Sequence, residues 1–481
     1  MFTTMQIVLL IGAVLLYAIC KIIFPPFNFP SNIPTIPFYV SFLSTYTNLD
    51  QRDIYEKYLR EKLEKYGAVK IYFANRWNIL VVKPEYLNQV FREELIYAKS
   101  GNQKKIPHAV LSQYTGDNVI SSHGTTWRTY RQLIQKPVQF PENFHVYENC
   151  KKFVNIINDY IGVEKEKSIL VGSFLQRLSL ANISQSMLGM DFGTLDSSNP
   201  EIHMKLNFVK SQIFKPLYMN FPMLDQLPIP SRIKARREVN EFRNYYSEKV
   251  IEAQHKDDVN KDSAAYQLYQ AMINGKITKK QFTDNLVIIL VAGHENPQLF
   301  FTSLLYIMAK YPLVQTQLRR ELLSTPLEEI NDAPFLNSVI FETLRFFPPL
   351  GQIINRCTTL DAVLGGVIRI PKGVYVGYNN YATTHSSEWP NADKFAPERW
   401  GESIEEIMKN YKRAKSNATL PSFHGGRRAC LGERFALFES KVFLKEVLEN
   451  FEIKMDETWV EKLTPAGPIC PMMLKVLFKK I

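Results

Sequence analysis

The stretch FHGGRRACLG occupies residues 423–432 and places one cysteine, Cys430, in a loop with glycines on both sides. Glycine lets a backbone approach another group closely and adopt tight turns. Arg427 and Arg428 come just before the cysteine, and a helical pattern begins at Glu433. Neighbouring cations and the start of a helix both lower the pKa of a thiol, so we expect a thiolate here. Such a loop can hold a thiolate against iron in a flat, anionic ring, with backbone N–H groups bonding the sulfur.

Five residues of this stretch fit the pattern F-x-x-G-x-R-x-C-x-G, namely Phe423, Gly426, Arg428, Cys430 and Gly432. The pattern resembles the haem-binding signature of the cytochrome P450 superfamily. The resemblance implies a cytochrome P450 fold, predominantly α with minor β, and haem b as the cofactor. It also implies that Cys430 is the thiolate ligand of the haem iron and that Phe423 and Arg428 contact the haem. The alternative is a glycine-rich turn that buries an inert cysteine, as free cysteines often are.

The composition is that of a globular protein, with 46% hydrophobic and 22% charged residues in a chain of 481. The interior has no Ser/Gly linker or low-complexity tract, so we expect one large catalytic unit. Five cysteines are scattered without a CxxC pair, which favours a reducing compartment. Eight histidines without ligand spacing give no support to a zinc site. The net charge of +11 favours an anionic membrane surface or an acidic protein partner, and no dense basic tract points to nucleic acid.

Residues 5–24 form an apolar run whose one charge is Lys21. About 20 helical residues span about 30 Å, the thickness of the hydrocarbon layer of a membrane. Prolines follow at once, and they stop a helix and stiffen the chain. We therefore expect a transmembrane anchor over 1–24, a proline-rich hinge over 25–37 and a catalytic domain over 38–481.

The charge distribution around this run also predicts its orientation. Positive charge lies on its C-terminal side, which by the positive-inside rule puts the catalytic domain in the cytosol. A cleaved signal peptide is the alternative, but the first twenty residues hold no Lys or Arg and no good cleavage site follows. Membrane-bound cytochromes P450 are similar in this arrangement. The resemblance implies a single-pass protein of the endoplasmic reticulum membrane.

Helical periodicity dominates the rest of the chain, with a minor set of short strands. An amphipathic helix is expected over 51–66, short strands over 69–73 and 77–82, and a long final helix over 433–451. Strands and helices do not alternate, so nothing indicates a doubly wound sheet.

A helical segment with the sequence FETLR carries Glu342 and Arg345, three residues apart and so on one face. The segment FAPERW, with Arg399, lies between this helix and the cysteine loop. In the cytochrome P450 family these positions form a buried Glu–Arg–Arg network that braces the loop. The alternative is a surface ion pair, which stabilises a helix by only about 0.2–0.5 kcal/mol.

Several basic residues match positions that bind the haem propionates in the family. Trp127 and Arg131 resemble its W-x-x-x-R helix, and Arg356 matches a further propionate-binding arginine. An arginine can bond a carboxylate with two N–H groups, and the indole N–H of tryptophan can donate as well. Taken alone, each arginine fits a solvent-exposed position equally well. Together with Arg428 they would neutralise two carboxylates.

Residues 285–310 are apolar on nearly all faces, which predicts a buried helix. The sequence AGHENP in its middle resembles the oxygen-activating segment of the family, where small residues leave room over the haem and an acid–alcohol pair delivers protons. Glu295, Asn296 and Pro297 are therefore the candidate catalytic residues. The family's threonine is replaced by Asn296, whose amide can position water but cannot relay a proton as a hydroxyl does.

Pro297 adds a second departure from the family pattern. Proline has no N–H to bond the carbonyl of Gly293 and clashes with it, so we expect a local distortion of the helix. We expect this distortion to provide the space for oxygen and water. The alternative is a kinked buried helix with no catalytic meaning.

Six blocks resemble, more narrowly, the dityrosine-forming members of the family, which are N-formyltyrosine oxidases of yeast spore-wall synthesis. The blocks are residues 98–107, 114–121, 291–298, 354–359, 370–380 and 462–468. This resemblance implies coupling of two N-formyl-tyrosines through their rings into bis-formyl dityrosine for the spore or cell wall. Lys104 and Lys105 lie in the segment that usually caps the pocket and could meet an anionic substrate; the alternative is that both face solvent.

The family resemblance further implies an NADPH-dependent P450 reductase as electron donor and a small aromatic substrate. Arg427, Arg434 and Lys441 are candidates for the reductase-docking face. Three alternatives remain open on the sequence alone. They are a hydroxylating monooxygenase of another small aromatic or lipid, a non-catalytic haem-binding membrane protein, and a membrane-tethered hydrolase with Cys430 as nucleophile.

Overall fold

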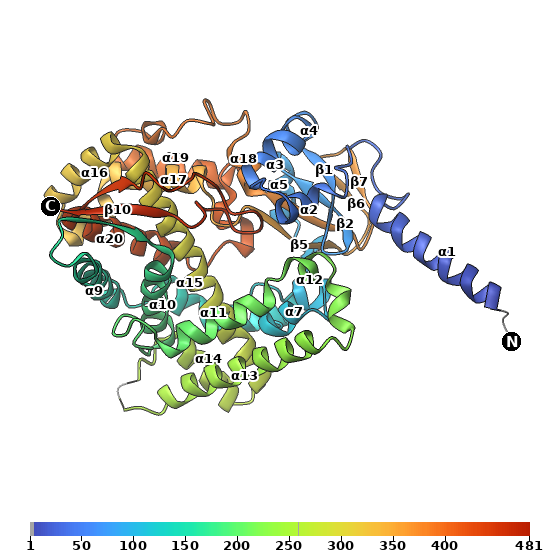
Figure 1. Ribbon diagram of the computed structural model, residues 1–481, viewed down its shortest axis with the longest axis horizontal. Helices are drawn as coiled ribbons and strands as arrows, with labels where there is room; N and C mark the ends of the chain where they lie inside the picture. The colour runs from blue at the N-terminus through green and yellow to red at the C-terminus, as the bar shows by residue number, and fades with distance from the viewer. Residues whose placement is uncertain (1–3, 258) are drawn as a thin grey trace.

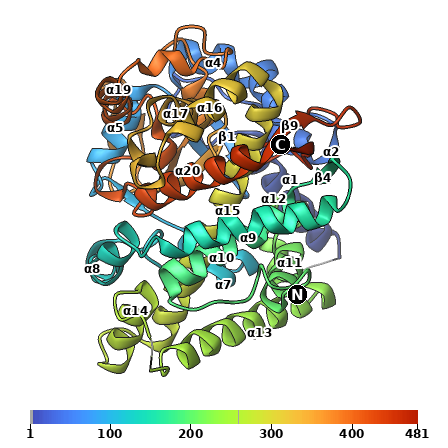
Figure 2. The same ribbon diagram turned by 90° about the vertical axis from the view of Figure 1, so that its left-hand side faces the viewer.

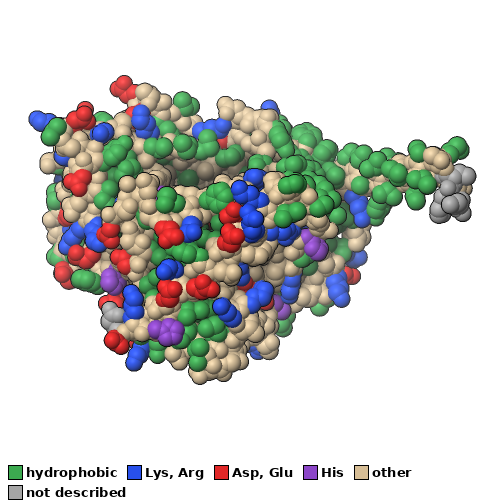
Figure 3. Space-filling model, turned by 60° about the horizontal axis from the view of Figure 1, so that its bottom comes forward, with side chains coloured by type: hydrophobic (Ala, Val, Ile, Leu, Met, Phe, Trp, Pro, Cys, Tyr) green, Lys and Arg blue, Asp and Glu red, His purple; other side chains and the backbone are tan. Residues whose placement is uncertain are grey.

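The structure is a computed structural model that describes residues 4–257 and 259–481. At the N-terminal end α1 (Thr4–Ile23) projects from a mostly helical body (Figure 1). None of its residues is buried, and within the described ranges α1 alone is long and apolar enough to cross a membrane. Figure 3 shows its hydrophobic side chains continuing onto the adjoining surface of the body. Exposed Phe24, Phe27 and Tyr39 follow α1 along the chain.

Helices make up most of the body, as the sequence predicts. In chain order they are α2 (Val40–Tyr46), α3 (Gln51–Ile54), α4 (Arg60–Tyr66), α5 (Pro84–Arg92), α6 (Asn102–Lys105), α7 (Val110–Thr115), α8 (Gly124–Gln139), α9 (Phe144–Ile161), α10 (Gly172–Leu188), α11 (Glu201–Ile213), α12 (Pro216–Asn220), α13 (Pro230–Ala253), α14 (Ala264–Ile273), α15 (Lys279–Lys310), α16 (Pro312–Ser324), α17 (Pro334–Phe346), α18 (Asn380–Thr384), α19 (Ile404–Ser416) and α20 (Glu433–Asn450).

The strands are short and gather into three sheets. They are β1 (Ala68–Phe73), β2 (Arg76–Val81), β3 (Tyr97–Lys99), β4 (Glu166–Leu170), β5 (Gln352–Thr358), β6 (Ala362–Leu364), β7 (Ile368–Ile370), β8 (Tyr375–Asn379), β9 (Phe451–Met455) and β10 (Lys475–Lys480). The largest sheet has the order β1-β2-β8-β5-β3, with β2 and β8 parallel and the other pairs antiparallel. It lies beside α1, at one end of the molecule (Figure 1).

The sequence-based predictions of these elements are confirmed in type and position. The helix expected over 51–66 is α3 and α4 joined by one π-helical segment, Tyr55–Leu59, and it ends at Gly67 with a φ of 70°. The strands expected over 69–73 and 77–82 are β1 and β2. The final helix is α20. The fold is predominantly α with minor β, as predicted.

The long helix α15 runs through the middle of the body, against α10 and α20 (Figure 2). A capping box between Thr278 and Gln281 starts it by satisfying free backbone N–H groups. Gly293 allows α10 to approach, because a Cβ at this position would lie 2.2 Å from a methyl carbon of Ile183. The apolar segment expected to be a buried helix therefore forms the core of the molecule.

Pro297 lies inside α15 without interrupting it, since the helix continues from Lys279 to Lys310. The local distortion expected from the sequence is therefore not a break in the helix. What proline removes is the N–H that would bond the carbonyl of Gly293.

Candidate active site

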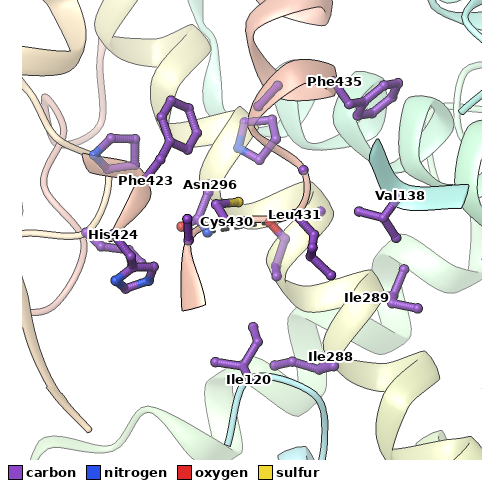
Figure 4. A pocket seen from close by; sticks show the side chains of 18 of the residues that line it. Ile120, Val138, Ile288, Ile289, Asn296, Phe423, His424, Cys430, Leu431 and Phe435 are labelled. Carbon is purple, nitrogen blue, oxygen red and sulfur yellow. Dashed lines mark hydrogen bonds between the residues drawn. The ribbon is translucent and has the colours of Figure 1, made fainter. Parts of the chain in front are cut away.

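A cavity of about 300 Å³ lies between the middle of α15 and the loop that carries Cys430 (Figure 4). Its walls are mostly apolar and include residues from α8, α10, α15 and the start of α20. Figure 4 shows the side chains of Ile288 and Ile289 on one side and Phe423 on another. The cavity brings together segments that lie far apart in the sequence.

Close backbone contacts shape the cysteine loop. At Gly426, whose φ is 62°, a Cβ would lie 2.7 Å from the carbonyl oxygen of Phe91, so only glycine fits without a shift. His424 also has a positive φ, of 60°, and its Nδ1 is hydrogen-bonded to the hydroxyl of Tyr378. The N–H of Cys430 donates to the carbonyl of Phe423 at 2.9 Å, which closes the loop.

Cys430 is exposed and contributes to the cavity wall. Desolvation by the surrounding residues raises the pKa of its thiol to about 11, although the backbone N–H groups of Gly432 and Glu433 act in the opposite direction. The lowered pKa expected from the neighbouring arginines and the helix start is therefore wrong for the loop by itself, because desolvation is the larger effect. A bound metal ion reverses the balance, since a coordinating thiol is deprotonated outright.

A cationic cluster borders the cavity near this loop. The Arg428 guanidinium lies 4.2 Å from the ring centre of Trp127, and its Nε is 2.8 Å from Oε1 of Glu94. The geometry of that ion pair leaves the buried Arg428 Nε without a hydrogen bond. Arg131 also lies near the indole, 5.6 Å from its centre, and its Nε donates to Gln135. Within the described residues, the indole N–H of Trp127 has no hydrogen-bond partner.

The free indole N–H of Trp127 and the two arginines fit the carboxylates of a haem, although Arg428 already donates to the carbonyl of Ser122. The apolar walls fit the haem ring. Arg356 differs from the other predicted contacts. It is buried in β5 beside an irregular pairing with β8, donates to the carbonyl of Tyr97 at 3.2 Å, and is not part of the cavity wall. Lys99, which the sequence analysis did not single out, takes the wall position on the neighbouring strand. Nothing in the sequence marks Lys99 as a wall residue. Its pairing with Arg356 in the sheet is the observation that places it there.

The three candidate catalytic residues on α15 separate in the structure. Asn296 and Pro297 line the cavity, whereas Glu295 does not. The Glu295 carboxylate instead pairs with Lys210 of α11, with a distance of 2.9 Å between Oε1 and Nζ. His294 is fully buried, and its Nε2 lies 3.2 Å from the same Lys210 Nζ. Because successive helical residues point in different directions, the acid and the amide do not face one space.

The predicted Glu–Arg–Arg network is confirmed. Glu342 is fully buried and accepts from Arg345 at 2.8 and 3.0 Å and from Arg399 at 3.0 Å. Trp400 adds an indole N–H at 3.2 Å. Ser422, at the start of the cysteine loop, donates to a carbonyl of the same helix α17 at 3.1 Å. The network and this bond connect α17 to the loop.

The structure corrects the positions of two lysines that the sequence analysis named, Lys105 for the pocket and Lys441 for the docking face. Lys105 is buried and donates to the carbonyl of Ile354 at 3.1 Å, outside the cavity wall, while Lys104 is exposed. Lys441 is buried as well and donates to Asn331, so it is not available for docking. Arg427 and Arg434 are exposed. Lysine stems are long enough to reach backbone acceptors under the surface, and sequence gives no sign of this.

The cysteine loop faces a buried helix across an apolar cavity, and a cationic cluster lies on one side. This arrangement defines a haem-thiolate protein. The chain belongs to the cytochrome P450 family, whose model, described as Cytochrome P450, matches residues 30–475. It is therefore a cytochrome P450 oxidoreductase with a haem-thiolate iron cofactor, a redox partner and a small-molecule substrate.

Individual relatives show how far the similarity extends. The chain is 49% identical over 478 residues to Cytochrome P450-DIT2 of Saccharomyces cerevisiae, covering 98% of each chain. It is 37% identical to Cytochrome P450 monooxygenase xanG of Aspergillus fumigatus, covering 92% of this chain and 86% of the relative. Among solved structures, the haem domain of a cytochrome P450DA mutant superposes with a TM-score of 0.72 at 18% identity, covering 86% and 90% of the two chains. This last likeness shows the fold.

Proposed function

We propose that this protein is a membrane-anchored oxidase that couples two N-formyl-tyrosines into bis-formyl dityrosine for a spore or cell wall. The observation that carries the proposal is the 49% identity with Cytochrome P450-DIT2 over nearly the whole of both chains. That similarity includes the six blocks that resemble the dityrosine-forming members of the family. The site supports the proposal through its departure from the hydroxylase pattern at Asn296 and Pro297.

The haem, when bound, supplies the oxidising power that dioxygen and reductase-derived electrons generate at its iron. The residues that would hold it are Cys430 as thiolate ligand and Trp127, Arg131 and Arg428 at the propionates. Phe423 would contact the ring, and Arg356 would act from the strand behind the wall. The thiolate depends on the iron, because burial alone keeps the thiol protonated at neutral pH.

The reaction removes one hydrogen atom from each of two phenols, and the two rings then join carbon to carbon. In balance, two phenols, one dioxygen, two electrons and two protons give one biphenol and two waters. The electrons come from an NADPH-dependent reductase, and no oxygen atom enters the organic product. Asn296 faces the cavity with an amide, which can hold water as donor and acceptor but cannot pass a proton on as a hydroxyl does.

The mass of the product tests the proposal directly. The purified full-length protein is given N-formyl-tyrosine, NADPH and a P450 reductase, and the products are analysed by mass spectrometry. Coupling yields a dimer that has lost two hydrogens from the pair. A monomer carrying one added oxygen contradicts the proposal and supports the second candidate, a hydroxylating monooxygenase. The name of the Aspergillus fumigatus relative, Cytochrome P450 monooxygenase xanG, favours that second candidate.

The membrane arrangement is part of the same proposal. Residues 1–24 are a single transmembrane anchor, 25–37 a hinge and 38–481 a catalytic domain on the cytosolic side of the endoplasmic reticulum. The apolar, fully unburied α1 supports this arrangement. Protease added to intact microsomes is expected to degrade the catalytic domain without detergent. Protection of that domain until detergent is added contradicts the orientation and leaves the proposed chemistry untouched.

A further inference from the structure

Residues 116–122, in the connection between α7 and α8, form a loop that contributes to the cavity wall (the wall loop). Val119 and Ile120 are its cavity-lining residues. Figure 4 shows Ile120 and Ile288 of α15 on the same side of the cavity. The backbone of the loop is irregular, with turns and a bend in place of a helix or strand. Its position therefore depends on bonds to neighbouring elements.

Two adjacent residues of α15 hold the backbone of the wall loop. Oδ2 of Asp284 accepts from the N–H of Asp117 at 3.0 Å, and Oδ1 of Asn285 accepts from the N–H of Val119 at 3.0 Å. Both α15 residues are fully buried. The amide of Asn285 is itself fixed, because its Nδ2 donates to the carbonyl of Gln281 at 2.8 Å. The two bonds therefore hold the loop at the point where its wall residues begin.

The same part of α15 also supplies the neighbouring wall. Ile288 and Ile289 line the cavity, and they lie four residues after Asp284 and Asn285. Residues four apart in a helix lie on the same face. One face of α15 thus holds the wall loop and, one turn further on, forms the wall beside it. A shift of the loop along α15 would change the shape of the cavity between them.

The Asp284 carboxylate links the wall loop to a third element, α13. Its Oδ1 pairs with Nη2 of Arg243, whose Nη1 donates to the carbonyl of Tyr114 at 2.6 Å. Gly116 has a φ of 59°, and a Cβ there would lie 2.1 Å from the same Oδ1, so the close approach requires glycine. Burial removes hydration from both charges of an ion pair, so such a pair is weak evidence for stability. Its effect is to fix one arrangement of the three segments.

We propose that Asp284 and Asn285 are positioning residues, which hold the wall loop so that Val119 and Ile120 give the cavity one fixed shape for the substrate. The cavity wall includes the two loop residues but neither of the α15 residues. The affinity of a ligand that reaches this wall therefore depends on side chains outside the wall. The proposal requires the haem cavity and does not rest on the coupling reaction.

Two variants release the wall loop from opposite sides. Asn285→Leu keeps a branched side chain and removes the acceptor for the loop N–H. Gly116→Ala places a methyl group against the Asp284 carboxylate and leaves α15 unchanged. Asp284 itself is left intact, because its removal would strand the buried Arg243 and destabilise the whole protein.

Each variant has a matched control of the same kind. Gln315→Met replaces a buried amide of α16 that accepts the N–H of Ile453 at 2.8 Å and lies outside the cavity wall. Gly162→Ala changes another glycine of positive φ, 69°, where the nearest atom to a Cβ is 3.9 Å away. The controls therefore reproduce the lost buried bond and the backbone strain without touching the wall loop.

Two quantities are measured on each full-length holoenzyme. The first is the rate of backbone amide hydrogen exchange in residues 116–122, followed by mass spectrometry. The second is the pair of dissociation constants of imidazole and 4-phenylimidazole, obtained from haem difference spectra. Both probes bind iron through an imidazole nitrogen, and they differ by a phenyl group that has to occupy the cavity.

In the expected result, Asn285→Leu and Gly116→Ala both accelerate amide exchange in the wall loop by about fivefold or more, because a hydrogen bond is lost. The dissociation constant of 4-phenylimidazole rises by about fivefold or more, since the phenyl group loses contact with an apolar wall. That of imidazole changes by less than about twofold. Gln315→Met and Gly162→Ala change neither the exchange in the loop nor the ratio of the two constants.

Faster exchange in both variants with an unchanged ratio of constants would overturn the assignment, because the bonds would then hold the loop without shaping the cavity. Unchanged exchange would overturn it as well, and so would a control that shifts the ratio as much as its partner. If Asn285→Leu does not fold, Gly116→Ala and Gly162→Ala decide the outcome. The products formed from N-formyl-tyrosine do not enter this test, so a failure of the coupling proposal is distinct from a failure here.

Discussion

The Glu342 carboxylate has no exposed surface and accepts hydrogen bonds from Arg345, Arg399 and Trp400. Glu342→Gln would leave two arginines around a neutral amide. Removing one partner of a buried ion pair costs about 3–5 kcal/mol. We expect a loss of this size in the free energy of unfolding, measured with denaturant on the holoenzyme.

Glu398→Gln is the matched control, because Glu398 lies beside Arg399 in the chain but is exposed. It is expected to change the stability by less than about 0.5 kcal/mol. Equal effects of the two substitutions would mean that the buried network does not stabilise the fold.

Asn296 and Pro297 both line the cavity, and their substitutions separate two explanations of the site. Asn296→Thr restores the family's hydroxyl and is expected to leave dimer formation about unchanged, because coupling does not require an alcohol relay. Pro297→Ala supplies the N–H that proline lacks toward the carbonyl of Gly293 and is expected to reduce dimer formation. Both are measured as product per electron supplied by the reductase.

An inactive Asn296→Thr variant would contradict the view that coupling makes little use of an alcohol relay. A fully active Pro297→Ala variant would show that the missing backbone bond has no role in the reaction. The continuous α15 makes this second outcome informative, because the substitution is not expected to straighten a break in the helix.

At the scale of elements, the contact between α20 and α10 contains a buried acid. Glu439 is fully buried, accepts from Nδ2 of Asn182 at 3.0 Å through Oε2, and has no partner for Oε1 among the described residues. Burial raises its pKa to about 8, from an ordinary value of 4.5. The folded protein therefore retains a proton that the unfolded chain releases.

Because the folded state binds more protons between these two pKa values, stability falls as pH rises from about 4.5 to about 8. Glu439→Gln removes this dependence. The variant is expected to exceed wild type in unfolding free energy at about pH 8, on the order of a few kcal/mol, and to differ little at about pH 5. Chemical denaturation at the two pH values measures the difference. The same difference in unfolding free energy at both pH values would show that Glu439 does not titrate in this range. Substitution of an exposed glutamate, Glu388→Gln, serves as the control.

At the scale of the whole molecule, the net charge of +11 favours an acidic redox partner. Arg427 and Arg434 are the exposed cations close to Cys430 in the chain. Reversing both to Glu is expected to raise the apparent KM for the reductase several-fold at low salt, with a smaller difference at high salt because screening weakens surface charge interactions.

Lys234→Glu, an exposed reversal on α13, is the control for net charge. Figure 2 shows α13 along the lower edge of the molecule, away from α20. An equal rise in KM for this control would mean that overall charge, and not the face near the thiolate, attracts the reductase.

The cysteine loop, the Glu342 network and the buried α15 were predictable because each depends on local chemistry or on fixed residues at fixed spacing. The glycines at 425 and 426 indicate a close approach of the backbone to another segment. A run that is apolar on all faces predicts a core helix. The raised pKa of Cys430 was not predictable, because desolvation by the surrounding residues outweighs the groups that lower it.

The sequence by itself determined the resemblance to the family, the apolar N-terminal helix and the helical fold of this protein. The helices follow from periodicity and length, and the resemblance follows from the motifs that the chain shares with the family. Only the tertiary structure decided which polar side chains reach the cavity. It directs Glu295 to Lys210, buries Lys105 and Lys441 against carbonyl groups, and places Lys99 in the cavity wall. The physical reason is that the partner and exposure of a charged side chain are set by elements packed against it from elsewhere in the chain, whereas periodicity reports only the face on which it begins.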